Sequence, residues 1–86
     1  MYNIELSAPA SKFLERLQTK NKSICDRIEN AIDSLQAEPL KGKKLTGELS
    51  YMRALRVGDY RVLYTVIASR VIIQIIKIGH RREIYR

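Results

Sequence analysis

Hydrophobic positions follow a helical period in the first half of the chain and alternate as in a strand in the second half. Residues 2–6 alternate between apolar and polar and predict a short strand. Ser7 can cap the helix that follows, in which apolar residues recur on one face at Ala10, Phe13, Leu14 and Leu17. A polar break at residues 19–22 precedes a second, longer helix that Pro39 ends. The first half is therefore expected to be a strand followed by an antiparallel pair of helices.

Beyond a loop at residues 40–50, the sequence takes on the alternation and the β-branched content of strands. Two-residue turns at Gly58-Asp59 and Ala68-Ser69 separate three expected strands, residues 51–57, 60–67 and 70–78. The last strand is apolar on both faces, which favours a central position in the sheet. The element order βααβββ predicts one α+β domain over residues 1–86. Both helices should pack on one face of a twisted antiparallel sheet and leave the other face bare.

The charges are divided as unevenly as the hydrophobic pattern. Residues 1–40 carry five basic and six acidic side chains, whereas residues 41–86 carry eleven basic and three acidic ones, so the net charge of +7 arises in the second half. A cationic face on a neutral scaffold suits a polyanion, and nucleic acid is the commonest polyanion that a small cytosolic protein meets. Charge alone does not separate a nucleic-acid binder from a merely basic protein.

The composition argues against a disulfide, a metal centre and a membrane anchor. Cys25 is the only cysteine, so no internal disulfide can form, and its helical setting favours a small buried hydrophobe over a nucleophile. With His80 as the only histidine, one His and one Cys cannot supply the three or four ligands of a zinc site. The chain has neither paired carboxylates for Mg²⁺ nor a glycine-rich phosphate loop. It also lacks a signal peptide and any apolar run near the ~20 residues of a membrane span, so we expect a cytoplasmic protein without a cofactor.

The turn at Gly58-Asp59 makes a specific prediction about two arginines, because it places Arg56 directly across from Arg61. Like charges that face each other across a sheet destabilise it unless an anion completes the pair, and guanidinium groups fit a phosphate well. The plainer alternative is that both arginines are solvated surface side chains. The same register puts Arg53 on the other face, opposite Tyr64, which requires either a bulge or a place near the sheet edge.

The basic tail adds candidates for chemistry on such a phosphate. His80, beside Arg81 and Arg82, can act as a general acid or base, or it can be an ordinary surface histidine. Tyr85 can stack on a base or can pack the end of the sheet. A nuclease without metal favours RNA as its substrate, because the 2′-hydroxyl of RNA can attack the neighbouring phosphate.

Two segments of the second half form a combined motif, RVGDYRVLY at residues 56–64 and GHRREIY at residues 79–85. Together with Leu45-Thr46-Gly47, Ser50-Tyr51 and the two-helix opening, this motif resembles the RelE/ParE superfamily of type II toxins, and its RelE-like branch in particular. The resemblance covers essentially the whole chain. It implies a toxin that binds the ribosomal A site and cuts mRNA there without metal, by attack of the 2′-hydroxyl. It also implies a cognate, RelB-like antitoxin that wraps the toxin and blocks it.

Carried over by position, the resemblance gives roles to residues of the middle hairpin and the tail. Arg61 and Arg81 match arginines that stabilise the phosphate in the transition state, and the predicted pairing adds Arg56 to this catalytic set. Tyr85 matches an aromatic residue that stacks on an mRNA base, and His80 stands where several members carry a proposed general acid. The remaining cations are expected to hold RNA backbone: Lys41, Lys43, Lys44, Arg53, Arg82 and Arg86.

One pair of positions departs from the family pattern. The best-known member carries two lysines, one of them a proposed general base, where this chain has Met52 and Ala54. The general base therefore stays open between His80, Lys43, Lys44 and the ribosome. The departure also keeps a less active enzyme in view.

Two alternatives to a ribosome-dependent nuclease share the fold. A ParE-like inhibitor of DNA gyrase needs no RNA chemistry. The combination of His80, Arg81 and Tyr85 argues against it, because ParE-type members generally lack the full set. A catalytically weakened relative that only binds RNA or an antitoxin would fit Met52 and Ala54.

Overall fold

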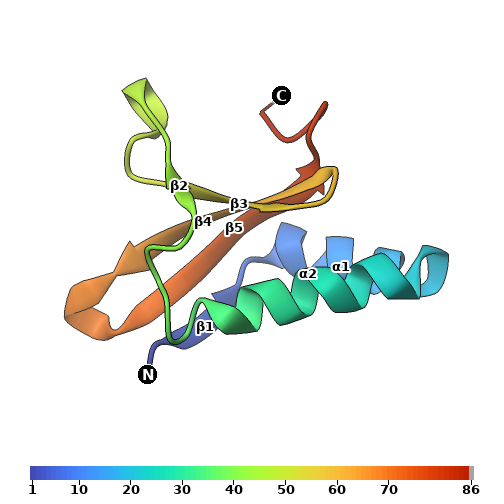
Figure 1. Cartoon of the computed structure of the whole chain (residues 1–86), viewed down its shortest axis with the longest axis horizontal. Coiled ribbons are helices and arrows are strands. Elements are labelled where there is room, and N and C mark those ends of the chain that lie inside the picture. The colour runs from blue at the N-terminus through green and yellow to red at the C-terminus, as the bar shows by residue number, and fades with distance from the viewer. Residues whose placement is uncertain (86) are drawn as a thin grey trace.

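Two helices cover one face of a five-stranded sheet in the computed structural model, which describes residues 1–85 (Figure 1). The elements are β1 (Asn3–Leu6), α1 (Ala8–Lys20), α2 (Lys22–Ser34), β2 (Lys43–Lys44), β3 (Arg53–Val57), β4 (Tyr60–Ile67) and β5 (Ile72–His80). Short 3₁₀ helices lie at Gly47–Leu49 and Ala68–Arg70. The predicted α+β class and the two-helix opening are confirmed, and β2 is a strand within what was expected to be a loop.

The strands lie in the order β1-β5-β4-β3-β2. The prediction of a wholly antiparallel sheet is wrong for β1, which runs parallel to β5, whereas the other neighbours are antiparallel. The reason is that β1 pairs with the last strand of the chain rather than with the next one. β5 has neighbours on both sides, as its two apolar faces predicted, although it is second rather than third in the order.

Both helices begin at side-chain caps. Ser7 Oγ accepts a hydrogen bond from the backbone N–H of Ala10 at 3.1 Å and donates to Ile76 O at 2.7 Å, so one hydroxyl caps α1 and ties it to β5. Asn21 alone separates the helices, and its side chain accepts from the N–H of Ile24 at 3.2 Å. Across residues 1–85, no helix has the length and apolar character needed to span a membrane.

Several element ends differ from the sequence prediction. β3 begins at Arg53 rather than at residue 51, and β5 covers Ile72–His80 rather than residues 70–78. α2 ends at Ser34 rather than at Pro39, and the Ser34 hydroxyl donates at 2.6 Å to a carbonyl one turn back, where it competes with the helical hydrogen bonds. The turn after β4 is a 3₁₀ helix followed by Val71 at φ 55°, rather than the two-residue turn Ala68-Ser69. The first hairpin turn is as predicted, with Gly58 at φ 59° in the left-handed region that glycine adopts without strain.

The main core fills the space between the helices and the sheet. Four side chains of β3 and β4 are buried in it: Leu55, Val57, Val62 and Tyr64. They belong to one cluster with apolar residues of both helices and β5: Ala10, Leu14, Leu17, Cys25, Ile28, Ile32, Leu35, Ile73, Ile75 and Ile78. Full burial of one large aliphatic side chain contributes about 1.5–3 kcal/mol, so this layer supplies the main driving force for folding.

A second, smaller core lies on the face away from the helices, so the prediction that this face is bare is wrong. Met52 and Leu63 pack there with Ile84 of the C-terminal tail. The Ile84 side chain is 2% exposed. The tail turns back at His80, whose carbonyl accepts from the backbone N–H of Ile84 at 3.0 Å. Figure 1 shows the tail, in red, on the side of the sheet opposite the helices.

A β-bulge divides β5. The pairing of β4 with β5 shifts by one residue between Leu63 and Tyr64, which leaves Ile76 as an extra residue in β5. Before the bulge the odd-numbered side chains of β5 face the helices, as at Ile75, and after it the even-numbered ones do, as at Ile78. One extra residue therefore turns over the last part of the strand.

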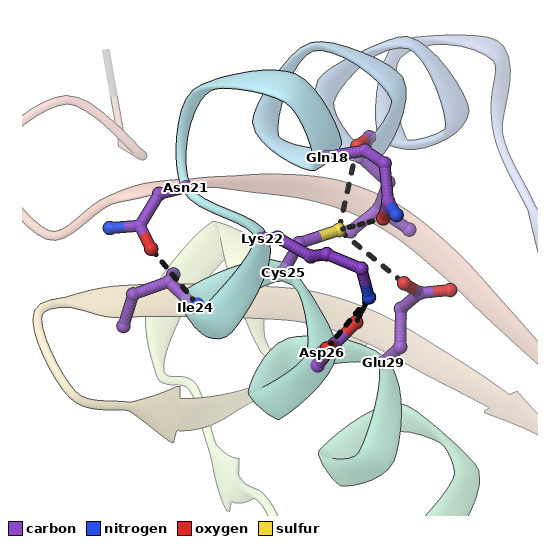
Figure 2. A network of polar contacts seen from close by, with 8 residues as sticks. Gln18, Asn21, Lys22, Ile24, Cys25, Asp26 and Glu29 are labelled. Atoms are coloured by element: carbon purple, nitrogen blue, oxygen red, sulfur yellow. Dashed lines mark hydrogen bonds and ion pairs between the residues drawn. The ribbon is translucent and has the colours of Figure 1, made fainter.

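Cys25 joins the two helices and is buried, as its helical setting predicted (Figure 2). Its sulfur lies 3.3 Å from Gln18 Oε1, 3.4 Å from Glu29 Oε1 and 3.5 Å from Leu14 O, so its one proton has three acceptors within reach. Burial, together with the contact to Glu29, raises the pKa of the Cys25 thiol. The thiol is kept protonated and shielded, which is the opposite of what a nucleophile needs.

Candidate phosphate-binding cleft

Arg56 and Arg61 face each other across the β3–β4 hairpin, as the turn predicted. Both project from the sheet face opposite the main core, since their chain neighbours are buried under the helices. Each makes one long contact with a backbone carbonyl, 3.4 Å from Arg56 Nε to Gly58 O and 3.4 Å from Arg61 Nη1 to Tyr60 O. Within residues 1–85, most of their N–H donors therefore remain unpaired.

An open cleft of about 540 Å³ lies beside this pair. Its lining combines four cations and one aromatic side chain with no carboxylate from the described residues: Lys43, Lys44, Leu45, Thr46, Ala54, Arg56, Arg61 and Tyr85. The two ion pairs in the described part of the chain involve none of these cations. Because like-charged groups on neighbouring strands repel each other, the cleft favours an anion that bridges them.

The two lysines of β2 differ in the face that they present. Lys43 pairs with Ala54, and Lys44 pairs with Arg53. Successive side chains of a strand alternate, so Lys43 shares the face of the arginine pair. Lys44 also borders a second hollow, which Leu40 and Arg53 line as well. Lys43 is therefore the lysine better placed to reach an anion held by the arginines.

The tail brings Tyr85 to the cleft by burying the residue before it. Ile84 packs over Gly79, where an added Cβ would stand 3.1 Å from Ile84 Cδ1. Tyr85 is 54% exposed and lines the cleft, as a ring that stacks on a base would have to be. Ile84 packs against the sheet, whereas the ring of Tyr85 remains at the surface.

Arg81 lies at the tip of the same hairpin rather than in the cleft lining. Its backbone N–H donates to Asp59 O at 2.8 Å, and its Nε is 3.7 Å from Asp59 Oδ1. Asp59 follows Gly58, whose carbonyl contacts Arg56, so Arg56 and Arg81 meet the same hairpin end. An exposed ion pair of this kind is worth only about 0–1 kcal/mol, so a phosphate can compete for Arg81.

His80 faces away from the cleft. Its ring packs edge-on against Tyr60, with 5.7 Å between ring centroids, and Tyr60 packs in the same manner against Phe13 of α1 at 5.9 Å. These three residues line a groove beside α1, on the helix side of the sheet. The bulge in β5 is the cause, because without it His80 would share the face of Arg61. The structure therefore does not bring the predicted general acid together with the arginine pair.

The remaining cations predicted to hold RNA are scattered. Arg53 is half-buried on the helix-side face, where its Nη1 donates to Gly42 O at 2.8 Å and to the carbonyl two residues earlier at 3.2 Å, so it supports a loop. Lys41 and Arg82 are exposed but lie outside the cleft lining. Arg86 lies outside the described residues.

Sequence reasoning missed three residues of this region, Leu45, Thr46 and Ile84. Leu45 and Thr46 line the cleft, but the preceding strand β2 is too short to show any alternation. Ile84 explains one departure from the family pattern, because Met52 is 5% exposed and packs against it. No group of three His, Cys, Asp or Glu side chains within residues 1–85 is arranged to hold a metal ion.

The sequence has relatives along its whole length. The family profile described as "ParE toxin of type II toxin-antitoxin system, parDE" matches residues 4–85. Toxin RelE of Mycobacterium tuberculosis is 33% identical over 86 residues, which cover 99% of this chain and 87% of the relative. Toxin RelG of the same organism is 31% identical over 86 residues, which cover 99% and 97%.

Solved structures share the fold. A chain of the toxin–antitoxin complex RelBE2 from Mycobacterium tuberculosis matches with a TM-score of 0.80 at 28% identity, covering 93% of this chain and 98% of that one. The isolated RelE toxin of E. coli matches with a TM-score of 0.79 over 93% and 84% of the two chains, and at 19% identity this is a likeness of fold alone. With the family profile matched over residues 4–85 and two relatives above 30% identity, this chain belongs to the RelE/ParE family of type II toxins.

Proposed function

We propose that this toxin is a metal-independent endoribonuclease that cuts mRNA on the ribosome and thereby inhibits translation. One observation carries the proposal. Arg56 and Arg61 face each other beside a cleft that Lys43 and Tyr85 also line and that has no carboxylate among its described lining residues. The similarity to toxin RelE and toxin RelG supports the RelE-like branch of the family.

The proposed reaction is an internal transfer within the RNA strand. The 2′-oxygen of one nucleotide forms a bond to the adjacent phosphorus, and the bond from phosphorus to the 5′-oxygen of the next nucleotide breaks. The products are a 2′,3′-cyclic phosphate and a free 5′-hydroxyl, so the proton lost from the 2′-hydroxyl is balanced by one gained at the 5′-oxygen. No co-reactant is consumed.

Arg56 and Arg61 act on the charge that develops on the non-bridging phosphate oxygens. A guanidinium group presents parallel N–H donors that match two phosphate oxygens, and two such groups are already opposed in the free protein. Their repulsion is relieved by the phosphate, and more strongly as the phosphorane gains negative charge, so the pair favours the transition state over the substrate. Tyr85 stacks on a base and so helps to align the 2′-oxygen with the phosphorus.

The proton transfers have fewer candidates. Of the groups left open as general base, Lys43 and Lys44 line the cleft, whereas His80 lines the groove on the helix side. Proton transfer at the cleft therefore falls to a lysine of β2 or to RNA of the ribosomal A site. Arg81 adds to phosphate stabilisation if it leaves Asp59 when RNA binds.

An antitoxin is the second expected partner. The RelBE2 structure is that of a toxin–antitoxin complex, which supports a RelB-like partner for this chain. The cleft lining holds four cations and, among the described residues, no carboxylate, which favours an acidic segment of the antitoxin there. An amphipathic helix that displaces the tail would act in the same sense. Either arrangement would deny RNA access, so the purified complex should lose ribosome affinity.

Primer extension on transcripts from cells that express the wild type or Arg61→Ala tests the proposal. With the wild type, translation should stop and new 5′ ends should map to codons in the ribosomal A site. Arg61→Ala should abolish both effects, because the phosphate loses one of its two opposed guanidinium groups. Arg70→Ala, which removes an exposed arginine from the 3₁₀ turn at the other end of β4, is the matched control and should stay toxic. A fully toxic Arg61→Ala variant would place the active centre elsewhere.

A ParE-like inhibitor of DNA gyrase is the second candidate, since the matching profile is that of a ParE toxin. Such a protein would induce DNA damage and filamentation while translation continues, so the same expression experiment separates the two. Ribosome binding with intact mRNA would instead indicate a catalytically weakened relative.

A further inference from the structure

Tyr64 makes two hydrogen bonds that the proposed reaction does not use. Its ring is fully buried in the main core. Its hydroxyl donates to Pro39 O at 2.8 Å and accepts from the backbone N–H of Gly42 at 2.8 Å. Burial raises the pKa of Tyr64, so the hydroxyl stays protonated and able to donate. A core tyrosine therefore holds the segment between α2 and β2 at two points.

Gly42 is held by both of its backbone groups, in an arrangement that we call the Gly42 clamp. Its N–H donates to Tyr64, and its carbonyl accepts from Arg53 Nη1 at 2.8 Å. An added Cβ would stand 2.6 Å from the Tyr64 hydroxyl oxygen and 3.0 Å from Ala54 O, so only glycine permits this close approach. The clamp thus fixes the residue immediately before Lys43.

The strand that carries Lys43 has few other constraints. β2 is two residues long, lies at the sheet edge and, within the described residues, pairs with β3 alone. One further backbone hydrogen bond, from Leu45 N to Met52 O at 3.1 Å, follows it. Loosening of so short an edge strand would let the Lys43 side chain leave its direction toward the cleft. The Gly42 clamp therefore adds a fixed point immediately before Lys43.

We propose that Tyr64 is a positioning residue of the cleft, which acts through the Gly42 clamp to aim Lys43 at the phosphate held by Arg56 and Arg61. The inference rests on the proposed function for the identity of the ligand, a phosphate of single-stranded RNA. It gives that phosphate a third cation from a third strand, β2. Tyr64, the residue that sets the direction of this cation, lies on the opposite face of the sheet.

The salt dependence of RNA affinity tests the proposal without requiring cleavage. The purified full chain is titrated with a short single-stranded RNA that is 2′-O-methylated and so cannot be cut, at several salt concentrations. Each phosphate neutralised by Lys or Arg adds about 0.7 to the slope of log affinity against log salt for a single strand. We expect Lys43→Met to lower the slope by about 0.7 and Tyr64→Phe to lower it by a similar amount. The double variant should lower it no further, because both changes remove the same contact.

Tyr60→Phe is the matched control. It also removes a tyrosine hydroxyl from the helix-side face of β4, but that hydroxyl makes no hydrogen bond among the described residues. It should leave the slope unchanged. Hydrogen exchange at the Gly42 amide should accelerate in Tyr64→Phe and stay as in the wild type in Tyr60→Phe.

The proposal is overturned if the slope losses of Tyr64→Phe and Lys43→Met add, or if folded Tyr64→Phe keeps the wild-type slope. A wild type whose RNA affinity does not depend on salt overturns it as well. A wild type that binds RNA but leaves mRNA intact on ribosomes overturns the proposed function instead, and the slopes still decide this inference. If Tyr64→Phe fails to fold, Arg53→Gln removes the other side of the Gly42 clamp and carries the same expectation.

Discussion

Arg53 and Arg56 stand on the same strand but differ in how much of their hydrogen bonding the fold uses. Arg53 is half-buried on the helix-side face, and its guanidinium group donates to two loop carbonyls at 2.8 and 3.2 Å. Arg56 is exposed on the cleft-side face, with one long contact of 3.4 Å. An arginine thus supports the loop on one face of the sheet, whereas on the other face an arginine keeps N–H donors free for a ligand.

The contrast extends to the two faces as wholes. On the helix side a continuous core is joined by buried hydroxyl and thiol groups that have partners, and no buried side-chain N or O atom of the described residues lacks one. Within residues 1–85, the cleft side has a small apolar cluster and, beside it, a group of cations in a cleft that no carboxylate lines. Stability is concentrated on one face and unbalanced charge on the other, so the cleft can be altered with little effect on the fold.

The largest expected effect is a change of activity without a change of stability. Arg56→Ala should lower the single-turnover rate of RNA cleavage on ribosomes by about 10²-fold or more, because a preorganised phosphate donor is lost. Its free energy of unfolding should stay the same or rise by up to about 1 kcal/mol, because a like-charged cross-strand pair is removed. Arg53→Ala should instead lower the free energy of unfolding by about 1–3 kcal/mol, because two carbonyls lose their donor. Urea unfolding beside the cleavage assay measures both, and equal destabilisation by the two variants would contradict the comparison.

A second pair of variants distinguishes the tail residue that stabilises the fold, Ile84, from the one proposed to contact RNA, Tyr85. Ile84→Ala should lower the free energy of unfolding by about 2 kcal/mol, at the low end for a buried isoleucine, because its cluster is small and close to the surface. Tyr85→Ala should change stability by no more than about 0.5 kcal/mol and should weaken RNA binding by about 1–3 kcal/mol through lost base stacking. Thermal unfolding and RNA titration of both variants give the two readouts. Strong destabilisation by Tyr85→Ala would mean that its ring packs rather than stacks.

The smallest expected effect concerns pH and is confined to the helix side. Burial raises the pKa values of Cys25 and Tyr64, so the folded state favours their neutral forms more than the unfolded state does. The resulting stability is fully present below the unfolded pKa values, about 8.5 for a thiol and about 10 for a tyrosine, and is lost as pH rises through the folded values. The urea midpoint should therefore fall above about pH 8.5, and the fall should be smaller in Cys25→Ala and Tyr64→Phe than in the wild type. Unchanged curves in both variants would show that neither group contributes.

Local sequence signals were sufficient where geometry is local. The two-residue turn sets the register of its hairpin, so the opposition of Arg56 and Arg61 followed from the chain alone. Ser7, as a residue that caps helices, likewise predicted the start of α1 from the local sequence. The partner of β1 could not be predicted, because nothing near residues 3–6 specifies pairing with a strand at the other end of the chain.

The position of His80 could not be predicted for a different reason. Residues 72–76 are apolar at nearly every position, so both faces of this stretch look alike in the sequence and a one-residue shift leaves no trace in the pattern. The bulge falls in this stretch and moves His80 to the helix-side face. The family resemblance suggested that His80 is a general acid, but the direction of the His80 side chain depends on the pairing of β4 with β5.

The extra residue in β5 also determines which residue of the strand lies beneath the tail. It brings Gly79, rather than a larger residue, to the cleft-side face, where Ile84 packs in the space that a Cβ would need. In a regular strand the register before the bulge would place Ile78 opposite Arg61 instead, and its side chain would occupy the space that Ile84 fills. The position of Tyr85 at the cleft thus depends on an irregularity in the pairing of β4 with β5, several residues earlier in the chain.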